Sequence, residues 1–250
     1  MDRRPRVRWP VEAPTSLSIV VPCFGHASYL PDTLESIVAQ TRRPDEVVFV
    51  DDGSPDDTAE ILQAFSASHR DRAGERFVLL ANEANVGQAA SLNRGIAAAS
   101  SELIMILNDD DYLMHDAVEA MVALFEQHRD VALIGAHSIH FAGHEALVGA
   151  PKRSTAYAAP ALPLVLHRPE DVSRYRNYID LNMTHSGSCF RKVAWEAVGG
   201  YCVDKTRRIV PFSDRDFQLR VNAMWPVAVA DKTPLSFWRN DSSVDAGRNT

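Results

Sequence analysis

The chain of 250 residues is 46% hydrophobic and 24% charged, an ordinary globular composition that argues against a disordered chain. Its net charge of −7 gives no support for a general nucleic-acid binder, so we expect no nucleic-acid partner. The three cysteines are scattered without a CxxC pair, which argues against a disulfide framework or a structural zinc site and fits a reducing compartment.

The first 16 residues differ in composition from the rest of the chain. Four arginines and one tryptophan lie among prolines there. This predicts a flexible basic tail over residues 1–16, with contact to an anionic membrane surface as the alternative. No apolar run reaches the roughly 20 residues of a membrane-spanning helix, and the N-terminus lacks a signal-peptide core. We therefore expect a cytoplasmic protein without a transmembrane segment, at most peripheral at the inner face of the membrane.

Short apolar runs alternate with amphipathic patterns from Leu17 to about Ala150. The predicted strands are Leu17–Pro22, Glu46–Asp51, Arg76–Ala81, Leu103–Leu107 and Val131–Ile139, and the predicted helices are Tyr29–Gln40, Asp57–His69, Gln88–Ala98 and Asp116–His128. The first two strands are nearly continuously apolar, which is typical of strands covered by helices on both faces. The alternation predicts a parallel sheet built from right-handed βαβ units.

Prolines interrupt the pattern after Gly149, between Pro151 and Pro169. Helices are then predicted near Glu170–Tyr178, Arg191–Val198 and Phe212–Met224, and short strands near Val227–Ala230 and Leu235–Trp238. No internal repeat is present. The economical interpretation is one catalytic domain over residues 17–250.

Two carboxylates, Asp51 and Asp52, directly follow the second predicted strand and precede Gly53. Open α/β folds bind ligands at the carboxyl edge of the sheet. A carboxylate there can accept a hydrogen bond from a base or a ribose, and glycine lets the backbone approach the ligand. A plain turn is the alternative. Similarly, Asn82–Gly87 opens the third helix, whose N-terminus could face phosphate or simply be capped.

The run Asn108–Asp111 ends the fourth predicted strand and places adjacent carboxylates at the same edge. Like charges in a row repel one another, so a divalent cation or a cationic ligand would neutralise them. The alternative is an acidic turn that caps the next helix. The sequence contains neither GxGxxG nor GxxxxGK[ST], which argues against the familiar NAD and ATP sites.

Asp214 and Asp216 lie at the start of the helix predicted at Phe212–Met224. Residues two apart cannot share a helix face, so we expect one carboxylate to face a cleft and the other to pair with Arg215 or Arg220. The helix N-terminus stabilises an ionised carboxylate, which suits a catalytic base. It suits an ordinary first-turn aspartate equally well.

Taken in order, these segments resemble the family 2 glycosyltransferases of the GT-A fold. The resemblance extends from about Leu17 to Val244 and rests on SIVVPCFGHASYLPDTLESI, DEVVFVDDGSPDDT, NVGQAASLNRGI, ELIMILNDDDYL, GSCFRKVAWEAVGGY and FSDRDFQLR. It implies a Rossmann-like, mixed, mostly parallel sheet flanked by helices. Residues 17–112 would form the nucleotide-sugar-binding half, and residues 113–250 the acceptor-binding half.

The resemblance also implies roles for particular residues. The residues expected at the nucleotide are Pro22, Phe24, Asp51, Asp52, Gly87 and Asp109, with Asp52 recognising the nucleoside. Mn²⁺ or Mg²⁺ is expected on Asp110 and Asp111, with Asn108 and Asp241 as further candidates. Asn108 stands where the family's DxDD motif usually begins with Asp, and Asp241 replaces the His of an RxH segment. Asp214 corresponds to the usual catalytic base, and His185 and Arg215 are expected on the acceptor side.

The implied reaction is inverting transfer of a sugar from a nucleotide-diphospho-sugar to an acceptor hydroxyl on a glycan, a lipid-linked sugar or a small molecule. UDP is the first expectation for the donor nucleotide, and GDP and dTDP are the alternatives. Two other functions stay open. A catalytically degenerate sugar-nucleotide-binding protein would explain why Asn108, Ser213 and Asp241 replace usual family residues. A sugar nucleotidyltransferase is the other, although the glycine-rich basic loop expected for one is absent.

Overall fold

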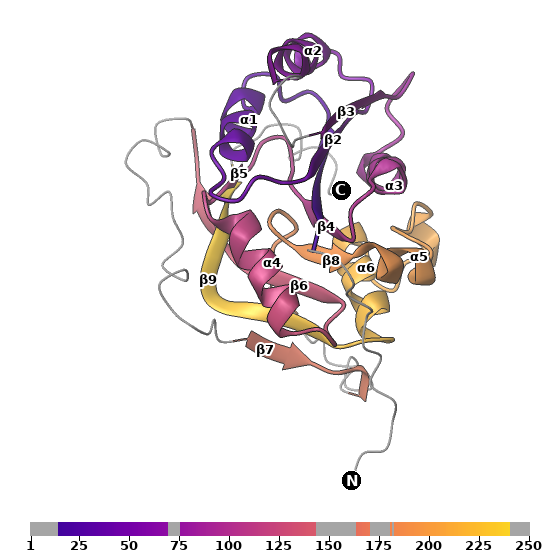
Figure 1. Ribbon diagram of the computed structural model, residues 1–250. Coiled ribbons are helices and arrows are strands. Elements are labelled where there is room, and N and C mark those ends of the chain that lie inside the picture. The colour runs from indigo at the N-terminus through magenta and orange to yellow at the C-terminus, as the bar shows by residue number, and fades with distance from the viewer. Residues whose placement is uncertain (1–14, 70–75, 144–163, 171–180, 182, 241–250) are drawn as a thin grey trace.

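Nine strands form one curled sheet in the part of the chain that the computed structural model describes, residues 15–69, 76–143, 164–170, 181 and 183–240 (Figure 1). The strands are β1 Leu17–Cys23, β2 Glu46–Asp51, β3 Arg76–Ala81, β4 Leu103–Ile106, β5 Tyr112–Leu113, β6 Leu133–Phe141, β7 Leu164–His167, β8 Cys189–Arg191 and β9 Val227–Arg239. The α-helices are α1 Leu30–Val38, α2 Thr58–His69, α3 Gln88–Ala98, α4 Ala117–Gln127, α5 Lys192–Val198 and α6 Ser213–Asn222, with a 3₁₀ turn at Lys205–Arg207. The strand order is β3-β2-β1-β4-β8-β6-β9-β5, and β7 pairs with β9.

The N-terminal half of the sheet is parallel, since β3, β2, β1 and β4 pair in this way. Every residue of β1 and β2 is buried, because helices cover both faces. Helices α1, α2 and α4 pack on one face, and α3, α5 and α6 pack on the other (Figure 1). This arrangement confirms the prediction from the continuous apolar runs.

Helix α3 lies very close to the sheet at Gly95. A Cβ atom there would lie 2.7 Å from Cγ1 of Val20 and 2.9 Å from Cγ2 of Val50, so any larger residue would push the helix away. The N-terminus of α3 is thereby held near the carboxyl ends of β1 and β2.

The C-terminal half makes the sheet mixed. Strand β8 pairs antiparallel with β4 and β6, whereas β9 pairs parallel with β6. Strand β9 bends, and it pairs antiparallel with β7 at its start and with β5 near its end (Figure 1). Because β5 directly follows Asn108–Asp111, the end of β9 lies beside the acidic run.

Two separate strands were predicted within β9, and this was wrong. The strand is continuous from Val227 to Arg239. Pro234 would be expected to end a strand, since it cannot donate to the ladder. It lies where the register between β6 and β9 shifts, opposite His137, and such an irregularity accommodates proline.

The other predicted elements that lie in the described residues agree with the structure to within two residues. Strands β5, β7 and β8, of two to four residues each, were not predicted. The predicted helix Glu170–Tyr178 lies, after its first residue, outside the described residues, as do most of the Pro-rich stretch and the basic tail. None of the described helices combines the length and apolar character needed to cross a bilayer.

Candidate active site

The acidic run lies between β4 and β5 at the carboxyl edge of the sheet, and Asp111 anchors it internally. The side chain of Asp111 accepts hydrogen bonds from the hydroxyl of Ser186, from Nδ2 of Asn108 at 3.1 Å and from the backbone N–H of Arg239 at 2.9 Å. Burial, followed by the charge of Asp110, raises the pKa of Asp111 to about 7. Both carboxylate oxygens of Asp111 therefore bind protein donors that fix the loop.

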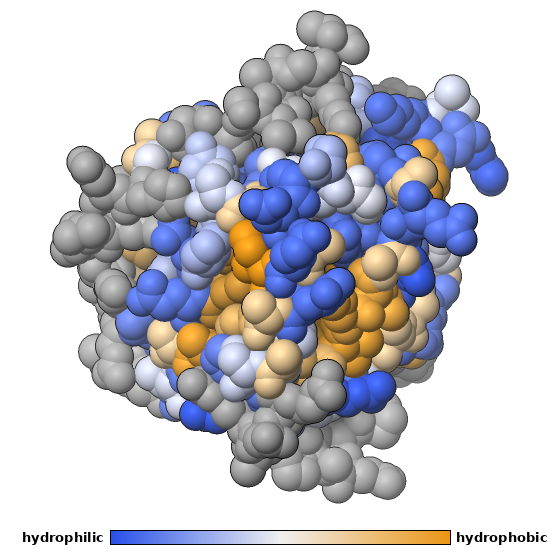
Figure 2. Space-filling view, turned by 90° about the horizontal axis from the view of Figure 1, so that it is seen from above, coloured by the Kyte–Doolittle hydropathy of each residue, from blue (hydrophilic) through white to orange (hydrophobic). Residues whose placement is uncertain are grey.

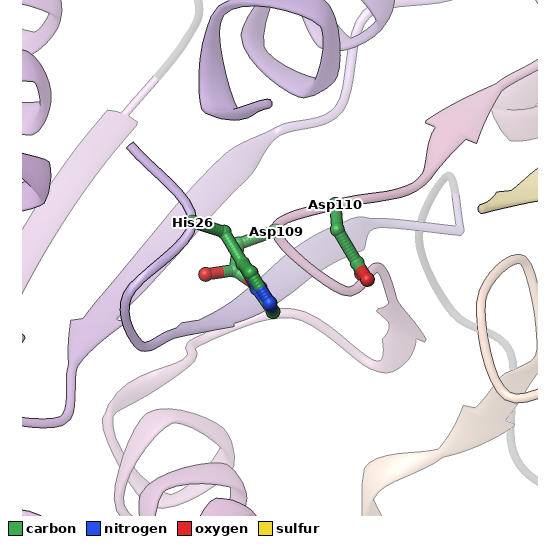
Figure 3. Close-up of side chains that lie close together, drawn as sticks. All are labelled: His26, Asp109 and Asp110. Carbon is green, nitrogen blue, oxygen red and sulfur yellow. The ribbon is translucent and has the colours of Figure 1, made fainter. Parts of the chain in front are cut away.

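His26, Asp109 and Asp110 gather beside this loop (Figure 3). One potential ligand atom from each lies within 4.8 Å of the others. His26 comes from the segment after β1 and the two aspartates from the segment after β4, and these strands are neighbours in the sheet. Asp111 is not part of this group. His26 was not predicted from the sequence, although its position just after β1 was a signal, since β1 ends at the same edge as β4.

The group formed by His26, Asp109 and Asp110 suits a divalent cation. The side chains of Asp109 and Asp110 are almost fully buried, and carboxylates held together away from water need a compensating positive charge. Carboxylate and imidazole are both ligands for Mn²⁺, and carboxylate suits Mg²⁺. The donor set thus fits the predicted metal: it contains the predicted Asp110, adds His26 and does not include the predicted Asp111.

The predicted nucleotide-side residues meet at the same edge. The Asp52 carboxylate accepts hydrogen bonds from the backbone N–H groups of Val86 and Gly87, both at 2.9 Å, and from Nδ2 of Asn82 at 2.7 Å. It therefore ties the end of β2 to the N-terminus of α3. A carboxylate has about four acceptor sites. Three protein donors already bind Asp52, so about one acceptor site is left for a nucleoside.

The turn after Asp51 is tight. Asp51 accepts a hydrogen bond from the backbone N–H of Ser54 at 3.0 Å. Gly53 has a φ of +69°, and a Cβ atom there would lie 3.0 Å from the backbone of Ala84. Glycine is thus required for the close approach of the two loops. Pro22 lies opposite Val50 at the end of β1.

Phe24 follows β1 directly and links the nucleotide side to the acidic run. Its backbone N–H donates to Oδ2 of Asp109 at 2.8 Å, and its side chain is half-buried. Asp109, predicted at the nucleotide, is thus held between Phe24 and His26.

On the acceptor side, the two aspartates of α6 have different surroundings. Asp216 is fully buried and accepts hydrogen bonds from the backbone N–H of Ile209 at 2.7 Å and from Nε of Arg220 at 2.9 Å. The expected pairing of one aspartate with Arg215 or Arg220 is therefore confirmed. Asp214 is half-buried in the first turn of α6.

Asp214 acts electrostatically on a histidine and a tyrosine. Nε2 of His185 lies 3.0 Å from the hydroxyl of Tyr201. Burial lowers the pKa of His185, and the charge of Asp214 opposes this shift. Burial also raises the pKa of Tyr201, and Asp214 adds to that shift. His185 was predicted from the sequence, whereas Tyr201 was not, and the only signal for Tyr201 was its place in the GGY part of a family segment.

The segment His185–Ser186 joins the two sides of the site. Ser186 donates its hydroxyl to Asp111 in the acidic run, while His185 contacts Tyr201 near Asp214. Predicted residue Arg215 is half-buried next to Asp214. Predicted residue Asp241 lies outside the described residues.

Large apolar side chains are exposed before α6. Ile209 is 63% exposed and Phe212 is 59% exposed. Figure 2 shows one face of the molecule, on which hydrophobic areas lie between hydrophilic residues. The segment that leads to Asp214 thus presents apolar surface to the solvent.

Comparisons with known proteins identify a matching family, related sequences and solved structures of the same fold. Residues 18–180 match the family model described as Glycosyl transferase family 2. Glycosyltransferase GlyG of Streptococcus pneumoniae serotype 4 is 32% identical over 119 residues, which are 48% of this chain and 38% of GlyG. Among solved structures, S. aureus TarS 1-349 in complex with UDP-GlcNAc has a TM-score of 0.65 and 18% identity, covering 91% of this chain and 59% of that one.

A second solved structure is the mannosyltransferase PcManGT from Pyrobaculum calidifontis in complex with GDP-Man and Mn²⁺. Its TM-score is 0.59 at 17% identity, covering 91% of this chain and 60% of PcManGT. At such low identities the likeness establishes a shared fold, and it confirms the predicted GT-A type α/β architecture. The aligned part is less than two fifths of GlyG.

Proposed function

Because the chain belongs to glycosyl transferase family 2, we propose that it is an inverting glycosyltransferase. It moves a sugar from a nucleotide-diphospho-sugar to an acceptor hydroxyl. The observation that carries the proposal is the position of the acidic run at the carboxyl edge of the sheet. The nucleotide-side loops lie on one side of it, and His185–Ser186 links it to the surroundings of Asp214 on the other.

We assign the donor to residues 17–112 and the acceptor to residues 113–250. UDP is the first choice for the nucleotide, since TarS was solved with UDP-GlcNAc. GDP and dTDP are the alternatives, and the GDP-Man complex of PcManGT keeps GDP in view. Pro22, Phe24 and Asp51 would line the nucleoside pocket. Gly87, at the N-terminus of α3, would face phosphate.

Asp110 would hold a Mn²⁺ or Mg²⁺ ion, together with the diphosphate. When bound, such an ion offsets the negative charge that builds on the leaving diphosphate. The Mn²⁺ in the PcManGT complex supports a cation in this fold. The protein contributes rigidity, because Asp111 and Arg239 hold the loop that carries Asp110.

Asp214 would act as the general base. It accepts the proton of the acceptor hydroxyl while the hydroxyl oxygen attacks the anomeric carbon. The bond between that carbon and the nucleoside diphosphate breaks on the opposite face, so the configuration inverts. The N-terminus of α6 favours the ionised carboxylate that this step requires. His185 and Arg215 would contact the acceptor.

Among the three acceptor classes, the exposed Ile209 and Phe212 favour one with an apolar part, such as a lipid-linked sugar. Both side chains lie just before Asp214 in the chain, and burial of apolar surface would add to the affinity for such an acceptor.

Calorimetric titration with UDP, GDP and dTDP, each with and without Mn²⁺, is the direct test. We expect Mn²⁺-dependent binding of one nucleotide, followed by release of that nucleoside diphosphate from the matching sugar donor. Binding without donor turnover would favour the catalytically degenerate alternative, for which Asn108 and Ser213 are the motivation. Formation of pyrophosphate would identify a sugar nucleotidyltransferase.

A further inference from the structure

The imidazole of His26 has no role in the proposed reaction, although it lies in one group with Asp109 and Asp110 (Figure 3). We propose that His26 is a direct ligand of the divalent cation and that Asp109 orients it. The site would then hold the cation on one nitrogen and one carboxylate from the protein, His26 and Asp110. This inference rests on the metal site of the proposed function.

The contacts of Asp109 assign it the orienting role. Its Oδ1 lies 2.8 Å from Nδ1 of His26, and its Oδ2 accepts the backbone N–H of Phe24 at 2.8 Å. Each oxygen of Asp109 therefore has a protein contact. When Nδ1–H donates to a carboxylate, the lone pair of the neutral ring is on Nε2, the form in which histidine binds metals. Metal-bound histidines usually have such a carboxylate partner.

The backbone around His26 is fixed by the loop between β2 and α2. The N–H of Gly25 donates to Oγ of Ser54 at 3.2 Å, and the N–H of Ala27 donates to Oδ2 of Asp56 at 2.9 Å. The side chain of His26 is only 11% exposed. A buried imidazole held in one orientation is suited to ligation, since little entropy is lost when the ion binds.

A nitrogen ligand changes the expected metal preference. Mg²⁺ prefers oxygen ligands in near-ideal octahedral geometry, whereas imidazole suits transition metals. The wild-type chain should therefore bind Mn²⁺ more tightly than Mg²⁺. If His26 only formed an ion pair with Asp109, replacing it would affect the two ions alike.

The test measures binding of Mn²⁺ alone and of Mg²⁺ alone to the full chain by calorimetry, and it records pulsed electron paramagnetic resonance of the bound Mn²⁺. We expect nitrogen modulation from a coordinated imidazole, which changes from the ¹⁴N to the ¹⁵N pattern when the histidines are ¹⁵N-labelled. His26→Ala should remove the modulation and weaken Mn²⁺ binding at least roughly 10-fold, with a much smaller effect on Mg²⁺. His140→Ala, at an exposed histidine of β6, is the matched control.

Asp109→Asn should retain the nitrogen modulation, because an amide oxygen can still accept from Nδ1. The labelling experiment needs no substitution, so the test survives if His26→Ala does not fold. Mn²⁺ bound without nitrogen modulation, but lost in Asp110→Ala, would overturn the role of His26 and leave the proposed metal site intact. Absence of Mn²⁺ binding even with UDP would overturn both.

Discussion

Arg239 donates a hydrogen bond from Nε to the backbone carbonyl of Asp110, 129 residues earlier in the chain, at 2.9 Å. Its guanidinium lies between the rings of Tyr29 and Phe141, at 4.1 and 4.4 Å from their centroids. It also pairs with Asp32 at 3.0 Å. Arg239 is almost fully buried, so this cation connects the end of β9 to α1 and to the acidic run.

Arg239→Ala should lower the free energy of unfolding by about 3–5 kcal/mol, because it leaves buried hydrogen-bond acceptors without their partner. Arg239→Lys should recover only part of this loss, since a lysine cannot reproduce the planar fork or the stacking between two rings. Urea denaturation of both variants measures the difference. Wild-type stability in Arg239→Ala would contradict the structural role.

Asp214→Asn should lower the turnover of the donor and acceptor by roughly 10²–10⁴-fold, because the amide cannot take the proton of the acceptor hydroxyl. Nucleotide binding should be unchanged, since the proposed role of Asp214 is to accept the proton of the acceptor hydroxyl and not to bind the donor. Steady-state kinetics and calorimetry give the two quantities. Full turnover in this variant would remove Asp214 from the mechanism.

Asp216→Asn is the matched control for Asp214→Asn. Asp216 is buried between the N–H of Ile209 and Nε of Arg220, so its charge stabilises the fold. We expect a lower melting temperature in this variant, by contrast with Asp214→Asn, which should keep wild-type stability. Equal loss of stability in both would mean that Asp214 is also structural.

Asp110→Ala should abolish the Mn²⁺-dependent part of nucleotide binding, since this carboxylate is proposed to hold the divalent cation that would offset the charge of the diphosphate. Calorimetry with UDP in Mn²⁺ and in a chelator separates this part from the rest. Binding in the chelator should be the same as in the wild type. If UDP binds Asp110→Ala with unchanged affinity in Mn²⁺, Asp110 is not the ligand.

Most of the N-terminal sheet and its helices could be predicted because their sequences show a continuous apolar run, as in β2, or an amphipathic period, as in α3. The acidic run could also be recognised, since a run of carboxylates after a buried strand is a local pattern. Likewise, the first turn of α6 placed Asp214 and Asp216 on different faces.

The division of roles within the site could not be predicted, because it depends on contacts between distant parts of the chain. His26 meets Asp109 across 83 residues, and Asp111 meets the hydroxyl of Ser186 across 75. In the sequence, Asp110 and Asp111 are equivalent neighbours. Only the fold makes one an internal anchor of the loop and leaves the other in the group with His26.

His185 should make the stability of the protein sensitive to acid. Burial lowers its pKa in the folded state, although Asp214 opposes the shift. An unfolded histidine has a pKa of about 6.5, so below that pH the unfolded chain binds a proton that the folded chain resists. The contribution to stability is therefore present above about pH 6.5 and is lost as the pH falls through the folded pKa.

We expect His185→Gln to lose less stability than the wild type between about pH 7 and pH 5, measured as the free energy of unfolding in urea at each pH. Glutamine does not titrate in this range, yet it can still hydrogen-bond to Tyr201. His140→Gln, on the exposed part of β6, should keep the wild-type loss. A parallel loss in His185→Gln and the wild type would show that another group causes the acid sensitivity.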